Sequence, residues 1–236
     1  MTDMTIETLK SKLKEVEQLK FIPTHRAGDT GVGKTLEDLL GIKENNIPLC
    51  DIGKEAELKA YRKDATSMLT LFTLEPKPKG GDRDRFLLDN FGYSKRKNAR
   101  SKELHSTVTA IDYNNQDLKL MVEKDKISVI ASGCKLEIFW DIDILNQKFK
   151  EKLPALVYVL ADRKIIDSKE HFHFNEAYFL SGFNFDHFRE MVKNGFIVAD
   201  FRMYYKPNGS VRNHGTAFRV KINKLYDCFE NKVRLI

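Results

Sequence analysis

The sequence lacks the features of membrane proteins, of disulfide-stabilised secreted proteins and of zinc modules. Its 236 residues contain only three cysteines, Cys50, Cys134 and Cys228, which are widely separated, so we expect neither a disulfide framework nor a Cys-x-x-Cys metal site. No apolar run approaches the ~20 residues that a membrane span requires. No signal peptide is expected either, because residues 2–20 read as a charged amphipathic helix. These absences predict a cytoplasmic protein without a membrane partner.

The chain has enough apolar residues for a core and an excess of positive charge. Apolar residues make up 42% and aromatic residues 11% of it, and 236 residues suffice for one large domain or two smaller lobes. The net charge is +6 and the pI is about 9.0. Such a balance favours an anionic partner, of which nucleic acid is the commonest.

One acidic segment stands out, the run DIGKEAELK that ends at Lys59. Alternate side chains of a strand share a face, so Glu57 and Lys59 point the same way while Leu58 points into the core. If the turn at Gly53 folds back, Asp51 arrives beside them. Two carboxylates hold a divalent cation through oxygen ligands, and a nearby ammonium can contact an attacking water. This set suits metal-assisted cleavage of a phosphodiester.

A salt-bridged strand face is the alternative interpretation of the same residues. With 31% charged residues the chain contains Glu-x-Lys three times, at Glu57–Lys59, Glu75–Lys77 and Glu230–Lys232. The second has a proline in its middle and the third lies in a polar tail. Only the first therefore resembles a buried strand.

The segment Gly28–Thr35, GDTGVGKT, satisfies the phosphate-loop pattern G-x-x-x-x-G-K-T. A phosphate loop needs a buried strand before the glycines and a helix after them. A helix is predicted from Thr35, with Gly41 as its C-cap, but the preceding FIPTHR does not suit a buried strand. We expect the glycines to shape the turn into this helix, on which Glu37 is either a solvated carboxylate or a third acid for the metal site.

Periodicity predicts a first helix at residues 5–20, capped by Thr5, and further helices at 141–150 and 185–194. Residues 47–62 read as a hairpin. Strands are expected at 67–73, 105–111, 118–123, 127–131, 134–140, 155–161 and 171–179. His171 and His173 share a strand face, but without a further ligand at suitable spacing they are expected to be an ordinary histidine pair.

Two segments have side chains suited to DNA. Residues 83–102 interleave Phe86, Phe91 and Tyr93 with seven basic residues, which is either a solvated charge run or a loop lying along phosphates. A turn at Pro207–Gly209 separates two strand patterns, and such a ribbon fits the major groove. The ribbon's polar side chains are Asp200, Arg202, Arg212, Asn213, His214 and Arg219.

Five segments in this order resemble the MvaI/BcnI family of type II restriction endonucleases, within the PD-(D/E)XK nucleases. They are GDTGVGKTLEDLLG, the Asp51…Glu57-Leu58-Lys59 unit, SMLTLFT, LHSTV at Leu104–Val108, and HGTAFRV at His214–Val220. The first two also resemble the mismatch-repair nicking enzyme MutH. The resemblance runs from about Arg26 to the C-terminus.

The resemblance implies an α/β fold, a PD-(D/E)XK core with a mixed sheet flanked by helices and a strand-rich DNA-recognition lobe. A single endonuclease domain would span residues 1–236, with roughly 1–165 mainly catalytic and roughly 166–236 mainly for recognition. It also implies that the catalytic residues are Glu37, Asp51, Glu57 and Lys59. Asp51, Glu57 and the Leu58 carbonyl would hold Mg²⁺, and Lys59 would assist the nucleophilic water.

The same resemblance implies that Asp200, Arg202, His214 and Arg219 face base edges. Arg212 lies where a relative carries another histidine. The expected partner is double-stranded DNA, cut by a monomer one strand at a time, with no obligate protein partner and with a cognate DNA methyltransferase in the same prokaryotic host. Open alternatives are a MutH-like nicking enzyme, a P-loop NTPase and a DNA-binding module without catalysis.

Overall fold

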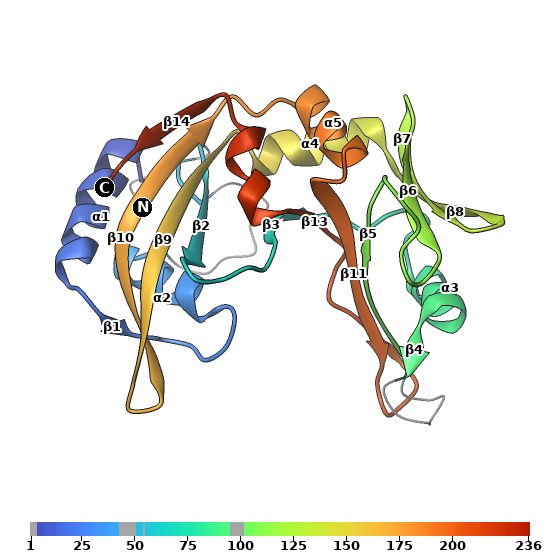
Figure 1. Ribbon diagram of the computed structural model, residues 1–236, viewed down its shortest axis with the longest axis horizontal. Helices are drawn as coiled ribbons and strands as arrows, with labels where there is room; N and C mark the ends of the chain where they lie inside the picture. The colour runs from blue at the N-terminus through green and yellow to red at the C-terminus, as the bar shows by residue number, and fades with distance from the viewer. Residues whose placement is uncertain (1–3, 43–50, 54, 95–101) are drawn as a thin grey trace. The chain divides into compact units, whose positions relative to one another are not determined.

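The chain forms two compact units, each built from discontinuous stretches. The computed structural model describes residues 4–42, 51–53, 55–94 and 102–236 (Figure 1). The first unit comprises Met1–Ser67, Lys150–Phe183 and Phe229–Ile236, and the second comprises Met68–Phe149 and Asn184–Cys228. The predicted lobes, 1–165 and 166–236, do not coincide with these units, because the chain leaves the first unit after residue 67 and returns at residue 150. The role of each unit remains a prediction.

A five-stranded mixed sheet forms the centre of the first unit. The strand order is β1-β10-β9-β2, and β14 also pairs with β10. The long strands β9 and β10 form an antiparallel hairpin, whereas β2 runs parallel to β9. The strands are β1 (Ile22–Pro23), β2 (Glu57–Arg62), β9 (Ala155–Ile166), β10 (Lys169–Ser181) and β14 (Asn231–Arg234).

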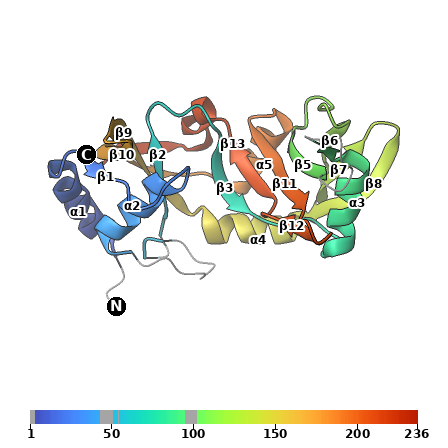
Figure 2. The same ribbon diagram turned by 90° about the horizontal axis from the view of Figure 1, so that it is seen from below.

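Two helices, α1 (Ile6–Gln18) and α2 (Gly31–Leu40), pack on this sheet (Figure 2). Helix α1 contacts β10 and helix α2 contacts β2, and the two helices also contact each other. Their buried leucines share one apolar core with Leu58 of β2 and with Val157 and Val159 of β9. Because strand side chains alternate, the residues on either side of Leu58 face away from this core.

The second unit is richer in strands. One sheet has the order β3-β13-β11-β5-β4 with β12 pairing to β11, and a second sheet has the order β6-β7-β8. The strands of the first are β3 (Leu69–Thr73), β4 (Tyr93–Ser94), β5 (Lys102–Val108), β11 (Ile197–Tyr205), β12 (Val211–Asn213) and β13 (Ala217–Val220). Those of the second are β6 (Leu118–Val122), β7 (Lys126–Ala131) and β8 (Cys134–Asp141).

Aromatic side chains fill the core of the second unit. Phe218 of β13 lies 5.4 Å from Phe72, 5.4 Å from Phe188 and 5.0 Å from Trp140, measured between ring centroids. The Trp140 indole donates a hydrogen bond to the Leu74 carbonyl at 2.8 Å, so its polar atom is satisfied in the interior. The helices are α3 (Gly81–Phe91), α5 (Phe185–Lys193), two 3₁₀ turns, Ile222–Lys224 and Tyr226–Cys228, and α4 (Ile142–Lys152), whose last three residues belong to the first unit.

The fold is mixed α/β with several sheets, as predicted. Thr5 caps α1 by accepting a hydrogen bond from the Thr8 N–H, which confirms the predicted start of that helix. The predicted helices near 141–150 and 185–194 are also present, as α4 and α5. Of the predicted hairpin at 47–62, residues 47–50 and 54 lie outside the described part. Among the described residues, no helix is long and apolar enough to cross a membrane.

The basic segment at 83–102 needs a correction. Its first part is helix α3 rather than a loop, and Arg83 is 6% exposed. The Arg83 guanidinium lies between the carboxylates of Glu75 and Asp84 and also donates to the Pro76 carbonyl at 2.6 Å. Burial of this charge is tolerated because it is paired on both sides. Arg83 therefore stabilises the interior of the unit rather than contacting DNA phosphates. Four of the other basic residues lie outside the described part of the chain: Lys95, Arg96, Lys97 and Arg100.

Candidate active site

The Glu-Leu-Lys triplet lies on β2 with the alternation predicted from the sequence. Leu58 is 7% exposed and packs in the core beneath α1 and α2. Glu57 and Lys59 lie on the opposite face, where the Lys59 Nζ donates to the Glu57 Oε1 at 2.7 Å. Glu57 is itself buried, with 6% exposure. The strand thus presents a buried carboxylate paired with a half-buried ammonium.

Asp51 reaches the same strand by a tight reversal of the chain. Ile52 and Ala56 form an isolated antiparallel bridge, and Gly53 between them has a φ of +51°, a conformation that glycine adopts readily. The turn brings the Asp51 Oδ2 within 3.1 Å of the Leu58 N–H, which donates to it. The structure therefore brings Asp51 to the strand that carries Glu57.

Lys152, which the sequence analysis did not single out, lies at the same carboxylate. Its Nζ is 3.6 Å from the Glu57 Oε2, and it is the last residue of α4. Strand β9 begins three residues later, at Ala155, and pairs with β2 in the register Glu57↔Leu156. The only sequence signal for Lys152 was its place shortly before a buried strand. That signal points to the site only once the pairing of β2 with β9 is known.

The donor set fits a magnesium ion. Mg²⁺ in proteins takes oxygen ligands, commonly one or two carboxylates supplemented by waters and substrate phosphates. The Glu57 Oε2 is buried and accepts no hydrogen bond in the described structure, which is unusual for a charged oxygen and is relieved by a bound cation. No group of three or more His, Cys, Asp or Glu side chains in the described residues is arranged to hold a metal. A metal here would rest on Asp51, Glu57 and backbone oxygen.

Glu37 lies on α2 beside the buried Leu36 and is half-buried. Helix α2 packs against β2, so Glu37 belongs to the helix adjacent to the strand of the site. Its predicted catalytic role remains a proposal.

The phosphate-loop alternative is not supported by the geometry of residues 28–35. The Lys34 Nζ pairs with the Asp38 carboxylate at 2.7 Å, and hydrogen bonds from Lys34 and His25 hold the pKa of Asp38 below its ordinary value. The Thr35 hydroxyl is fully buried, donates to the Gly31 carbonyl at 2.7 Å and accepts from the His25 N–H at 2.9 Å. Both side chains that would hold a nucleotide are therefore engaged within the protein.

The helix also begins at Gly31, four residues before the predicted start. A Cβ at Gly31 would overlap the Arg26 carbonyl oxygen and lie 2.7 Å from the Thr24 hydroxyl oxygen. Glycine is required here by close packing of the preceding loop. Strand β1 before that loop has only two residues and pairs antiparallel with β10, unlike the central parallel strand of a nucleotide-binding sheet.

The predicted DNA-reading side chains gather around Asp200 on β11 of the second unit. Asp200 is 5% exposed, and its Oδ1 accepts from the Thr107 hydroxyl at 2.9 Å. Its Oδ2 accepts from the Arg202 Nε at 2.8 Å and from Arg219 at 2.9 Å. Arg219 also donates to the Met68 carbonyl at 2.6 Å. The structure thus brings together three of the five predicted residues.

The other two lie on the adjoining segment. The His214 N–H donates to the Arg202 carbonyl at 2.9 Å, and the His214 ring lies 5.7 Å from the Tyr204 ring. Arg212 is exposed on β12 and pairs with Tyr204 across the ribbon. Sequence reasoning missed Thr107, although the LHSTV segment that contains it was part of the resemblance.

A partly buried network fixes the segment that carries His214. The Asn213 amide donates to Glu75 and to Asp84, both at 3.1 Å, and the Thr216 N–H donates to the Glu75 Oε1 at 2.6 Å. These two carboxylates are the ones paired with Arg83. Such a network was not predictable, because its members come from distant parts of the chain.

Both histidines of the pair on β10 contact backbone carbonyl groups. The His171 Nδ1 lies 3.1 Å from the Lys169 carbonyl, and the His173 Nε2 lies 3.1 Å from the Glu17 carbonyl. Each ring is thus hydrogen-bonded to the backbone.

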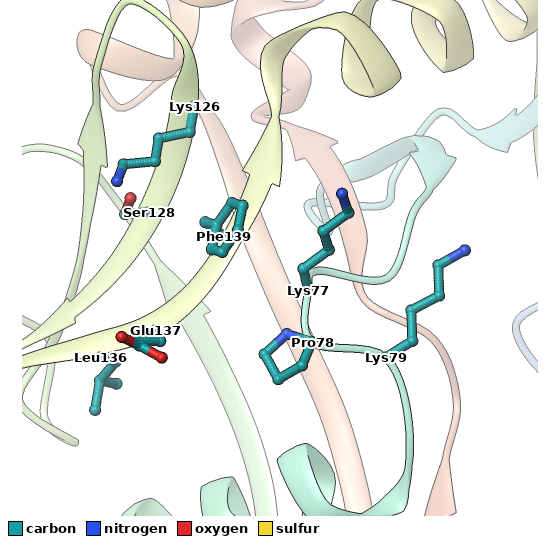
Figure 3. A pocket seen from close by; sticks show the side chains of 8 residues that line it. All are labelled: Lys77, Pro78, Lys79, Lys126, Ser128, Leu136, Glu137 and Phe139. Carbon is teal, nitrogen blue, oxygen red and sulfur yellow. The ribbon is translucent and has the colours of Figure 1, made fainter.

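A cavity of about 610 Å³ in the second unit contains none of the predicted site residues (Figure 3). The Lys126 ammonium points away from Lys77 and Lys79, Lys77 pairs with Asp141, and Lys126 lies 3.8 Å from Glu123. The cationic groups therefore do not converge on a common ligand. The cavity is lined by Lys77, Pro78, Lys79, Lys126, Ser128, Leu136, Glu137 and Phe139.

Comparison with known proteins defines the class as a restriction endonuclease, that is, a site-specific deoxyribonuclease. The model of the "MvaI/BcnI restriction endonuclease family" matches residues 10–229, so the chain belongs to this family. A search of the curated proteins gives no match. The resemblance stated from the sequence is confirmed.

Two solved structures are similar over nearly the whole chain. One is described as "Restriction endonuclease MvaI-cognate DNA substrate complex", with 26% identity, 98% of each chain covered and a TM-score of 0.83. The other is "Restriction endonuclease MvaI in the absence of DNA", with 25% identity, 100% of each chain covered and a TM-score of 0.56. The predicted fold class is thereby confirmed as well.

Proposed function

We propose that this protein hydrolyses double-stranded DNA at a short pseudosymmetric sequence, with Mg²⁺ as cofactor. The observation that carries the proposal is the convergence of Asp51, Glu57 and Lys59 at one strand, in a chain that belongs to a restriction endonuclease family. The solved relative in complex with cognate DNA supports double-stranded DNA as substrate. The catalytic residues in this proposal are Glu37, Asp51, Glu57 and Lys59.

The chemistry follows from the charges at β2. Asp51, Glu57 and the Leu58 carbonyl would hold the ion, which when bound polarises the scissile phosphate and lowers the pKa of a water. Lys59 is the cation of the site that is closest to Glu57, with 29% of its side chain exposed. Its ammonium orients the attacking water and stabilises the negative charge that develops on the phosphate. Glu37 would assist from α2.

Sequence reading is assigned to the ribbon of the second unit. Arginine donates to guanine and carboxylates accept from cytosine in the major groove. Asp200 holds Arg202 and Arg219 by hydrogen bonds, and an arginine fixed in this way loses little conformational entropy on binding DNA. Arg212 and His214 would contact the bases beside them.

The proposal also covers the oligomeric state of the protein, the order of strand cleavage and the protection of the host DNA. The protein would act as a monomer that cuts the two strands in separate events, in the cytoplasm of a prokaryote. A cognate DNA methyltransferase would protect the host DNA. A strand-nicking enzyme related to MutH is the second candidate, supported by the similarity of the first two sequence segments to that enzyme.

The decisive experiment is digestion of phage DNA by the purified protein with Mg²⁺ and with a chelator. We expect discrete fragments with Mg²⁺ and intact DNA with the chelator, and sequencing the fragment ends would give the site. Intact DNA under both conditions, despite binding, would contradict catalysis. A supercoiled plasmid distinguishes the second candidate, because a nicking enzyme stops at the open circle whereas the proposed enzyme proceeds to linear DNA.

A further inference from the structure

Glu57 has two lysines, and only one of them belongs to the Glu-Leu-Lys triplet. The Lys59 Nζ lies 2.7 Å from the Glu57 Oε1, and the Lys152 Nζ lies 3.6 Å from the Oε2. The two ammonium groups therefore contact different oxygens of the Glu57 carboxylate. Lys152 is placed there by the end of α4 and the parallel pairing of β9 with β2.

The contact of Lys152 differs in kind from that of Lys59. A separation of 3.6 Å is an ion pair without a hydrogen bond, and the Oε2 is buried and accepts no hydrogen bond among the described residues. The Lys152 side chain is 20% exposed and that of Glu57 is 8% exposed, so solvent screens this pair only partly. The Oε2 is held by charge and still has lone pairs for a closer cation.

The charges of the two metal-binding carboxylates and the two lysines beside them cancel before any metal binds. Asp51 and Glu57 contribute two negative charges, and Lys59 and Lys152 contribute two positive charges. A divalent cation entering this set meets two carboxylates but also two ammonium groups, one of which lies at the oxygen it would use. Like charges at such distances weaken binding.

We propose that Lys152 is a positioning residue that acts through Glu57 and competes with the divalent cation. Its ammonium holds the Glu57 Oε2 in the metal-free protein and weakens metal binding in the absence of DNA. This inference rests on the proposed magnesium site. It adds a residue that the Asp…Glu-x-Lys pattern does not contain.

The test is a titration of the full chain with Mn²⁺ in the absence of DNA. The signal of free Mn²⁺ in electron paramagnetic resonance measures how much of the ion is bound. Lys152→Met removes the charge and keeps the aliphatic stem, and Lys152→Gln is a second neutral variant in case the first fails to fold. Lys152→Arg retains the charge. Lys150→Met is the matched control, because Lys150 is exposed on the same helix and its loss changes the net charge equally.

We expect the neutral variants at residue 152 to bind Mn²⁺ about three- to tenfold more tightly than the wild type. Lys152→Arg should restore the wild-type affinity, and Lys150→Met should stay within about twofold of it. Equal affinity of Lys152→Met and Lys150→Met, with the folded circular dichroism spectrum retained, would overturn the inference and leave the metal site standing. Unchanged affinity in Glu57→Gln would instead overturn the metal site, and the inference with it.

Discussion

Glu57 in the first unit and Asp200 in the second are buried to nearly the same extent but are satisfied in opposite ways. Glu57 is 6% and Asp200 is 5% exposed. Both oxygens of Asp200 accept hydrogen bonds, from Thr107, Arg202 and Arg219. Of the Glu57 oxygens, Oε1 accepts one from Lys59 and Oε2 accepts none among the described residues.

The difference separates two uses of a buried carboxylate. An unsatisfied oxygen raises the energy of the folded protein until a cation binds to it, which is a property of a metal site. A fully satisfied carboxylate gains little from a cation and instead fixes the donors around it. The first arrangement suits chemistry on a phosphate, and the second suits presentation of arginines to base edges.

The largest effect should come from Lys59→Ala. We expect cleavage to fall by about 10²- to 10³-fold, because the cation that stabilises the developing charge is lost. Specific DNA binding should survive, because recognition is assigned to the other unit. Cleavage rates and gel-shift affinities measure the two properties separately, and Lys63→Ala, at an exposed lysine just beyond β2, is the control. Retained cleavage in Lys59→Ala would refute the catalytic assignment.

Asp200→Ala should lower the free energy of unfolding by about 3 kcal/mol, because Arg219 is left as an unpaired, largely buried charge. This is the lower end of the range for breaking a buried ion pair, since the Arg202 side chain is 45% exposed. Glu57→Gln should cost less, at most about 1 kcal/mol, because the amide oxygen can still accept from Lys59 and the two lost ion pairs, with Lys59 and Lys152, involve side chains that solvent partly screens. Urea denaturation of both variants checks the contrast, and equal losses would remove the distinction between the two carboxylates.

Arg202→Ala should weaken binding to the cognate sequence by about 1–3 kcal/mol and leave binding to other sequences nearly unchanged. The reason is that a base contact carries sequence information, whereas a phosphate contact does not. Competition binding with duplexes that carry the mapped site and with scrambled duplexes measures the affinity for the cognate sequence and the affinity for other sequences. An equal loss on all sequences would make Arg202 a phosphate contact.

The smallest effect concerns Glu170, whose carboxylate is paired with Arg62 and Arg163. The hydrogen bond that the Arg62 guanidinium donates to Glu170 is the main reason why the pKa of Glu170 lies below its ordinary value. A lowered pKa in the folded state adds stability above the unfolded value near 4.5, and this is lost as the pH falls through the folded pKa. Glu170→Gln should therefore cost less than about 1 kcal/mol at pH 7, and this cost should shrink as the pH falls below 4.5. A pH-independent difference would contradict this account.

The sequence predicted the parts of the site that depend on local structure. Strand alternation predicted that Glu57 and Lys59 share one face, and the chain reversal at Gly53, on which the position of Asp51 depended, is present in the structure. Lys152 was missed because its position depends on the parallel pairing of β2 with β9, which no local pattern encodes. Arg83 was misassigned for the same reason, since its partner Glu75 and their neighbour Asn213 are close only in the fold.

The most direct test compares Glu57→Gln with Glu55→Gln on a duplex that carries the mapped site. Glu55 is exposed in the turn before β2, so the pair differs in burial and position but not in chemistry. With Mg²⁺ present, we predict that Glu57→Gln binds the duplex and leaves it uncut, while Glu55→Gln cuts at the wild-type rate. Cleavage by Glu57→Gln at the rate of Glu55→Gln would contradict the assignment of the active site.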